Sequence, residues 1–492
     1  MLHLSELILR MTSGQLPHLD YMTPIGDLAI RPMAAILDLQ KRFDLNTNLG
    51  LGGAMLWGQM LVAVAVFPAV CWAGISRMSF GLATAFGIAV LGLITALVFG
   101  GVHTNLSLSM HYNRWAWALT FLIVVLVAIP ARRDRADVWD GLIIGLAMMA
   151  LALIKASYAV ALVLPVAFGL MIQFRARVAW VGIVAALAVW GLYSWAIGIE
   201  FWRAYAEDLL AVLNSDIRPF PSEPLRQVVL SPAFTPATIA GLAGGLLLRR
   251  DSRGPGLTLL MFLPAFAYIA FQNYGNDPLW LVPLAVCLIA QLPAPGEGAR
   301  AGMAGVALAA VALIASPMGN ILYSPIRHAL QPAQLFSPML PGADRADLMI
   351  LTQRTTDPYL QAPMPIDGPK PPPETFQGQP LGDCRLEGGL VAVLRAQAEA
   401  MMAQGLGGGP QPFVADFFAP HWMFADLTPL PGAAPWYYTG LPGFDAATHV
   451  MVPRCPSKPK VRAQILTLIT ETGVTLSDIY SDDVMTLYEI AR

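Results

Sequence analysis

The sequence predicts an α-helical, multi-spanning membrane protein that ends in a soluble α/β domain. Three observations support this fold class. Hydrophobic residues make up 56% of the 492 residues and charged residues only 13%, whereas soluble proteins carry about 25% charged residues. Long apolar runs follow one another as far as residue 316, and beyond it Pro, Gly, Asp and Gln become frequent. Lipid is therefore the expected solvent for the first part of the chain.

About ten apolar runs approach the length of roughly 20 residues that crosses a bilayer. We assign residues 49–316 to this helical domain. The two runs beside Lys155 fit either two tightly joined helices or one broken helix. The runs lie near 50–75, 80–100, 115–130, 140–154, 157–174, 178–198, 235–248, 256–272, 278–293 and 301–316.

Basic residues predict the orientation, because short cytoplasmic loops are enriched in Lys and Arg. They follow the first, third, fifth, seventh and ninth runs, so these connections are expected in the cytoplasm. The turn at Lys155 and everything after residue 317 are then external, as in a bacterial inner-membrane protein with a periplasmic C-terminal domain. The basic residues are Arg77, Arg132, Arg133, Arg135, Arg175, Arg177, Arg249, Arg250, Arg253 and Arg300.

Residues 1–48 are expected to form an external first loop that contains amphipathic helices. Apolar side chains from Leu2 to Met11 recur at helical spacing opposite Ser5, Glu6 and Arg10, which indicates a helix on the membrane surface. A second short helix is expected over Pro32–Phe43. No spanning run precedes this segment, so we expect one more spanning helix ahead of Met1; a short translocated tail is the alternative.

The C-terminal part is expected to contain a linker over 317–344 and an external α/β domain over 345–492. Helices are predicted near 386–403 and 461–471, and strands near 413–418, 449–452 and 484–490. Cys384 and Cys455 are the two cysteines of this domain, and an oxidising compartment permits a disulfide between them. Two unrelated buried thiols are the alternative.

Composition and motifs exclude several classes of function. The net charge of -2 offers no basic field for nucleic acid. We find no zinc-type cysteine pair, P-loop or dinucleotide fingerprint, and no metal ligands can be assigned. No cofactor is certain, although a divalent cation stays open.

Polar residues that gather at the predicted external edge are the candidate site. Asp20, in the loop Gly14–Gly26, is the candidate catalytic residue, although a loop Asp is more often a turn cap. The stretch His111–Arg114 also fits an interfacial belt, Asn273–Asp277 a reverse turn, and Glu200–Asp208 a solvated helix face. The candidate substrate-binding residues are His18, Thr23, His111, Asn113, Arg114, Lys155, Arg203, Asn276 and Asp277.

Lys155 interrupts a long apolar stretch, and an ionisable group at membrane depth is a functional candidate by default. A cation there suits a lipid-linked phosphate. Alternatively, its amine extends to the phosphate headgroups of the bilayer.

The first loop resembles the opening of the GT-C superfamily of membrane glycosyltransferases, which includes protein O-mannosyltransferases and lipid A aminoarabinose transferases. The resemblance is carried by His3, Gly14, Asp20, Thr23, Pro24 and Gly26. It implies a polyprenyl-phosphate sugar as donor, a catalytic acid in the first external loop and an external C-terminal domain. The family's acidic pair has no counterpart in residues 1–48, so Asp20 is either the general base or a second acid of the loop.

The sequence thus predicts an outer-leaflet glycosyltransferase that moves a sugar from a polyprenyl-phosphate carrier to an unidentified acceptor. A first-loop carboxylate would deprotonate the acceptor hydroxyl, and cations would stabilise the leaving phosphate. A lipid or polysaccharide transporter or flippase, and a non-catalytic membrane scaffold, are the alternatives.

Overall fold

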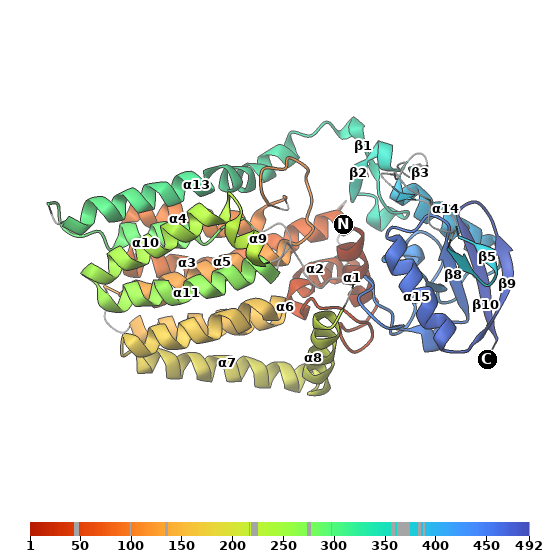
Figure 1. Cartoon of the computed structure of the whole chain (residues 1–492), viewed down its shortest axis with the longest axis horizontal. Helices are drawn as coiled ribbons and strands as arrows, with labels where there is room; N and C mark the ends of the chain where they lie inside the picture. Colours follow the sequence, from red (N-terminus) through yellow and green to blue (C-terminus); the bar gives the residue numbers. More distant parts are fainter. Residues whose placement is uncertain are drawn as a thin grey trace.

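A computed structural model describes residues 1–43, 49–98, 100–132, 136–215, 217, 225–272, 277–296, 298–355, 360–361, 374–381, 385–386 and 389–491. Long helices lie side by side along the long axis of the molecule, and the C-terminal region covers one end of this bundle (Figure 1). We call that end of the bundle the capped end.

The bundle contains the apolar helices that the sequence predicts. Six helices of the described chain are long and apolar enough to cross a membrane, namely α3, α5, α6, α7, α11 and α13; α4 and α12 are apolar but shorter. Length and composition therefore support a membrane protein without confirming about ten spans. The bounds are α3 Leu51–Arg77, α4 Phe80–Thr95, α5 His111–Ala128, α6 Ala136–Ile172, α7 Ala176–Ile197, α10 Phe234–Asp251, α11 Arg253–Gln272, α12 Leu281–Ala290 and α13 Gly298–Ala329.

Helix α6 folds back on itself at Lys155. The backbone there is not helical, with φ -156° and ψ 98°. Arg175, which follows α6, forms an ion pair with Asp140 near the start of α6. A straight helix would separate these two residues by about 50 Å, so the two halves run antiparallel. Of the two alternatives that the sequence left open, the structure therefore has two tightly joined helices.

A cluster of charged side chains forms the end of the bundle opposite the capped end. Asp140 accepts hydrogen bonds from Arg77 and Arg175 through one oxygen and from the Trp72 indole through the other, the last at 2.9 Å. The Arg132 N–H donates to the Ser76 carbonyl at 2.9 Å. We call this the arginine end; the sequence predicts that it faces the cytoplasm.

The first region lies between the bundle and the C-terminal region (Figure 1). It contains α1 Leu2–Thr12, the 3-10 turn Asp27–Ala29 and α2 Arg31–Arg42. Both predicted helices are present. The polar face of α1, however, is buried: Trp422 donates to Glu6 at 3.1 Å, and Arg10 donates to the Leu430 carbonyl at 3.4 Å. The C-terminal region therefore covers the face that was expected to contact water.

Two shorter helices connect α7 to α10. Helix α8 (Glu200–Leu213) lies crosswise beside the end of α7 (Figure 1), and α9 (Leu225–Leu230) follows. Ser215, beyond α8, donates to the Tyr438 carbonyl at 2.5 Å, so α8 leads from the bundle to the C-terminal region.

The C-terminal region is built around a sheet with strand order β7-β8-β10-β9. Strand β7 pairs parallel with β8, and β10 pairs antiparallel with both β8 and β9. Helix α13 continues through Pro317 to Ala329, so the predicted linker begins too early. The bounds are α14 Leu390–Ala403, β7 Phe413–Val414, β8 His449–Pro453, α15 Pro459–Glu471, β9 Thr475–Ser481 and β10 Met485–Ala491.

Small antiparallel pairs complete this region. Strand β1 (Phe336–Pro338) pairs with β2 (Met349–Leu351), and further pairs form between β3 and β6 and between β4 and β5. Cys455 is buried, whereas Cys384 lies outside the described residues, so their disulfide stays a prediction. The remaining strands are β3 Leu360–Gln361, β4 Thr375–Phe376, β5 Gln379–Pro380 and β6 Arg385–Leu386.

The arginine end provides a test of the packing. Replacing Asp140 by Ala leaves the fully buried Arg77 without its carboxylate, so we expect a loss of about 3–5 kcal/mol of folding stability. Thermal unfolding of the purified protein in detergent measures it. Asp137→Ala is the matched control, because Asp137 is 46% exposed and lies 3.9 Å from Arg175; we expect it to change stability by less than about 1 kcal/mol. Equal shifts for the two variants would contradict this account.

Candidate functional site

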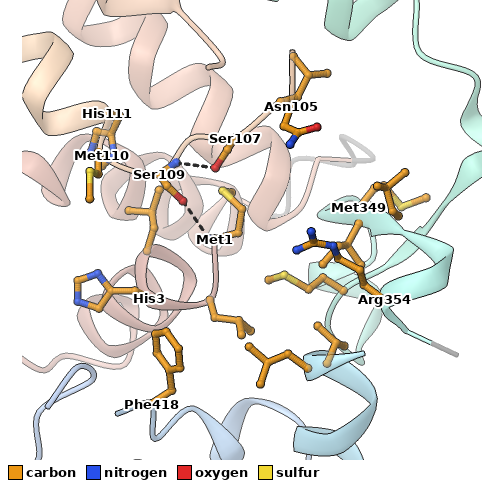
Figure 2. A pocket seen from close by; sticks show the side chains of 18 of the residues that line it. Met1, His3, Asn105, Ser107, Ser109, Met110, His111, Met349, Arg354 and Phe418 are labelled. Atoms are coloured by element: carbon orange, nitrogen blue, oxygen red, sulfur yellow. Dashed lines mark hydrogen bonds between the residues drawn. The ribbon is translucent and has the colours of Figure 1, made fainter. Parts of the chain in front are cut away.

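A cavity lies at the capped end, where the bundle, the first region and the C-terminal region meet. Its volume is about 840 Å³, and its walls come from the start of α1, the α4–α5 loop, the end of α13, and β2 with the turn after it. Figure 2 shows side chains from all three regions converging on it. We call this cavity the junction pocket. Its polar wall includes Asn105, Ser107, Ser109, Arg327, Gln331 and Arg354.

Two arginines give the junction pocket its charge. Arg327 donates to the Thr104 carbonyl at 3.2 Å and to Asn320 at 2.8 Å. Arg354 ends the 3-10 turn Thr352–Arg354 after β2, and Figure 2 shows its guanidinium directed into the cavity. The described lining residues include no carboxylate. The pocket therefore favours an anion.

The rest of the pocket wall is apolar and adaptable. Met110, Met339 and Met349 line it together with Phe418 and Trp436. Methionine is flexible and polarisable and fills irregular spaces. A ligand with one anionic group and one apolar chain matches this combination of side chains.

Two of the predicted residues touch the pocket or its border. His111 lines it and points its Nε2 at the Ala29 carbonyl at 2.7 Å. Lys155 donates to Asn113 at 2.8 Å, and its amine lies 5.0 Å from the ring centre of Tyr112, a lining residue. Lys155 thus joins the turn of α6 to the start of α5 beside the pocket.

Arg114 does not take the role that the sequence predicts. Its side chain is only 2% exposed, and it donates to the carbonyls of Val98 at 2.6 Å and Ala96 at 2.8 Å. The α4–α5 loop contributes lining residues to the pocket. Arg114 therefore holds the wall of the site and cannot reach a substrate phosphate.

Asp277 also holds the α4–α5 loop. Its carboxylate accepts a hydrogen bond from Gly101 N–H at 2.6 Å, and burial raises the pKa of this carboxyl. Asn320 donates to the carbonyls of Gly101 and His103 at 3.1 and 2.9 Å. Asn276, the other candidate in this turn, lies outside the described residues.

Asp20 lies away from the junction pocket. It is exposed, and its carboxylate accepts the Leu16 N–H at 2.6 Å, which is the turn-cap role. The pocket uses α1 residues between Leu2 and Leu7, whereas Asp20 follows the other end of this 11-residue helix. Ile25 and Ile30, which follow Asp20 in the chain, line the pocket, whereas Asp20 is not among its described lining residues.

His18 and Thr23 fasten the first loop to α8. The His18 Nδ1 lies 2.8 Å from Asp208, and the Thr23 N–H donates to the same carboxylate at 3.0 Å. The His18 ring stacks on Tyr205 with 4.3 Å between ring centres, and its side chain is 0% exposed. This arrangement closes the ring off from a substrate, so it favours a structural role.

Sequence reasoning missed Asp208, because α8 was interpreted as a solvated face. That interpretation is correct for Arg203 and Glu207, which are 82% and 64% exposed and pair at 3.4 Å. Phe201 and Tyr205 are buried, and Asp208 continues their stripe at helical spacing. The apolar stripe was the signal that could have identified the buried face. Arg203 therefore lies in solvent outside the described lining of the pocket.

The structural role assigned to Arg114 can be tested by substitution. Arg114→Ala leaves buried carbonyls of the α4–α5 loop without a donor, so we expect thermal stability to fall by about 2–4 kcal/mol. Arg203→Ala, which removes an exposed arginine, should change stability by less than about 0.5 kcal/mol. Thermal unfolding in detergent compares the two. An Arg114→Ala variant as stable as the unchanged protein would restore Arg114 as a substrate-binding candidate.

The described residues contain no group of three or more His, Cys, Asp or Glu side chains arranged to hold a metal ion. No protein-family model, curated protein or solved structure matches the chain. The chemistry of the junction pocket must therefore be argued from its own residues.

Proposed function

We propose that this chain is an outer-leaflet glycosyltransferase of a bacterial inner membrane, which moves a sugar from a polyprenyl-phosphate carrier to a lipid, glycan or protein acceptor. The observation that carries the proposal is the junction pocket. It lies where apolar helices meet the C-terminal region, and it combines two arginines with a methionine-rich wall. In the proposal the arginine end faces the cytoplasm and the C-terminal region is periplasmic.

The two arginines are suited to the phosphate of the carrier. Arg327 comes from the end of α13, whereas Arg354 comes from the turn after β2, so they approach from different elements. Guanidinium groups form short, charge-assisted hydrogen bonds with phosphate oxygens. These bonds strengthen as charge develops on the departing phosphate, which favours transfer of the sugar. A phosphate leaving group also needs no strong general acid.

The apolar wall is suited to the prenyl chain next to the phosphate. Lys155 and Tyr112 lie beside the same cavity, at the end of the bundle where lipid headgroups would meet the protein. Lys155 can add positive charge there from beside the pocket, although it is not one of the described lining residues. The proposal therefore places the lipid phosphate at the capped end and the prenyl chain along the bundle.

Among the described first-loop carboxylates, Asp20 is best suited to accept a proton, because Glu6, Asp27 and Asp38 each pair with an arginine. Glu6 and Asp27 are also buried. Asp20 is exposed, and in the described chain its carboxylate accepts the Leu16 N–H. Asp20 is not among the described lining residues of the pocket, so it can act as the base only where substrate binding brings the acceptor hydroxyl and the sugar within its reach; its role is therefore tested separately from phosphate binding.

The alternatives find less support. A transporter or flippase typically has charged or broken helices at the bilayer midplane. The break in α6 lies instead beside the first region, since Gly26 N–H donates to the Ile154 carbonyl at 3.2 Å. A scaffold needs no pocket that combines convergent arginines with an apolar wall.

Phosphate binding is the first test of the proposal. Replacing Arg327 and Arg354 separately by Ala should weaken binding of undecaprenyl phosphate to the purified protein by about tenfold each, because each removes one charge-assisted contact of about 1.4 kcal/mol. Arg203→Ala is the control, since its guanidinium lies in solvent. Unchanged affinity in both pocket variants would count against the proposal.

The base is tested by Asp20→Asn, which keeps a turn-capping oxygen but removes the proton acceptor. We expect loss of the surface glycan in cells that depend on this protein, with the affinity for undecaprenyl phosphate unchanged. Glutamate at position 20 should restore part of the glycan, because it returns a carboxylate. Intact glycan with Asp20→Asn would remove Asp20 as the base and leave the pocket proposal standing.

A further inference from the structure

The Asp347 carboxylate, from the C-terminal region, accepts hydrogen bonds from the start of helix α3. Asp347 accepts hydrogen bonds from the N–H groups of Gly50 at 2.8 Å, Gly52 at 2.9 Å and Gly53 at 2.7 Å. The start of a helix carries partial positive charge and N–H groups without helical partners. Asp347 satisfies three of these donors from 294 to 297 positions away in the sequence.

The glycines make this approach possible. A Cβ atom at Gly50 would lie 2.4 Å from the Asp344 carbonyl oxygen, and one at Gly52 would lie 2.7 Å from the Asp347 carbonyl oxygen. Both oxygens belong to the backbone, so a side chain at either position forces the two segments apart. The close contact therefore depends on the glycines at the start of α3 as well as on Asp347.

The segment that contains Asp347 also forms a wall of the junction pocket. Asp347 directly precedes Leu348 and β2, and Met349 and Arg354 line the pocket. Arg345 donates to the Met423 carbonyl at 3.3 Å, so the same segment is also tied to the C-terminal region. Leu348 is buried in the main core. The hydrogen bonds to α3 thus connect this wall to the bundle.

We propose that Asp347 is a positioning residue for the junction pocket: its bonds to the start of α3 hold the β2 wall in place and so set the position of Arg354. This inference rests on the proposed function only for its effect on ligand affinity. The contact itself is independent of any ligand.

The contact is tested by distance measurement in the full-length protein. Spin labels at Leu351→Cys on β2 and Trp57→Cys on α3 occupy exposed positions, in a Cys71→Ser background. Pulsed electron paramagnetic resonance should give a narrow distance distribution that broadens and shifts with Asp347→Ala. Gly52→Ala, which acts from the other partner, should do the same. Asp344→Ala is the control, because its side chain is 49% exposed and 3.7 Å from Arg345.

The effect on the pocket is tested by binding of undecaprenyl phosphate. Asp347→Ala should weaken binding five- to tenfold, and Arg354→Ala added to it should weaken binding no further, because Arg354 is already displaced. If Asp347 stabilises the protein without positioning Arg354, the two substitutions act independently, and their fold-changes in affinity multiply.

Each outcome has a separate meaning. An unchanged distance distribution with Asp347→Ala overturns the contact. A changed distribution with multiplied effects on affinity overturns the positioning role. If the unchanged protein binds no undecaprenyl phosphate, the proposed function fails, and the distance measurement still decides whether Asp347 holds the wall.

Discussion

Helix α5 is almost completely buried, and the packing of the bundle follows from that constraint. Within its 18 residues, 94% are buried. A buried helix end cannot leave its last carbonyl groups to water, so other segments must supply the donors. The carbonyls at the end of α5 accept hydrogen bonds from Arg77 of α3 and from Gln291 at the end of α12. They also accept hydrogen bonds from Gln173 and Arg175, which lie between α6 and α7. Asp140 then neutralises part of the charge that these arginines bring.

The opposite end of α5 uses polar groups in a comparable way. Arg114 and Asp277 secure the α4–α5 loop, and Lys155 ties the turn of α6 to Asn113. Four of the nine residues predicted to bind substrate, Asn113, Arg114, Lys155 and Asp277, thus hold segments beside the junction pocket in place. Arg327 and Arg354 carry the charge inside it. In the proposed site, supporting residues of this kind keep the two arginines in place.

Local patterns predicted the helices and the turn at Lys155, because apolar length and periodicity depend on neighbouring residues. They could not predict that Glu6 and Arg10 are buried, since Trp422 and Leu430, more than 400 positions away, provide the cover. The same limit applies to Arg354 and Arg327, which no motif marks. They become a site only when the end of α13 and the turn after β2 meet at one cavity. Asp20 was a candidate because it lies in a polar loop predicted to be external, and the described lining of that cavity does not include it.

In the proposed function the junction pocket lies on the external face of the membrane and binds a lipid phosphate. Labelling of Ser107→Cys, within the pocket wall, by a membrane-impermeant maleimide tests it directly. We predict labelling in intact cells from outside, absent from the unchanged protein, and protection of the purified variant by undecaprenyl phosphate but not by an uncharged prenyl alcohol. Labelling only after the membrane is permeabilised, or equal protection by the two lipids, would contradict it.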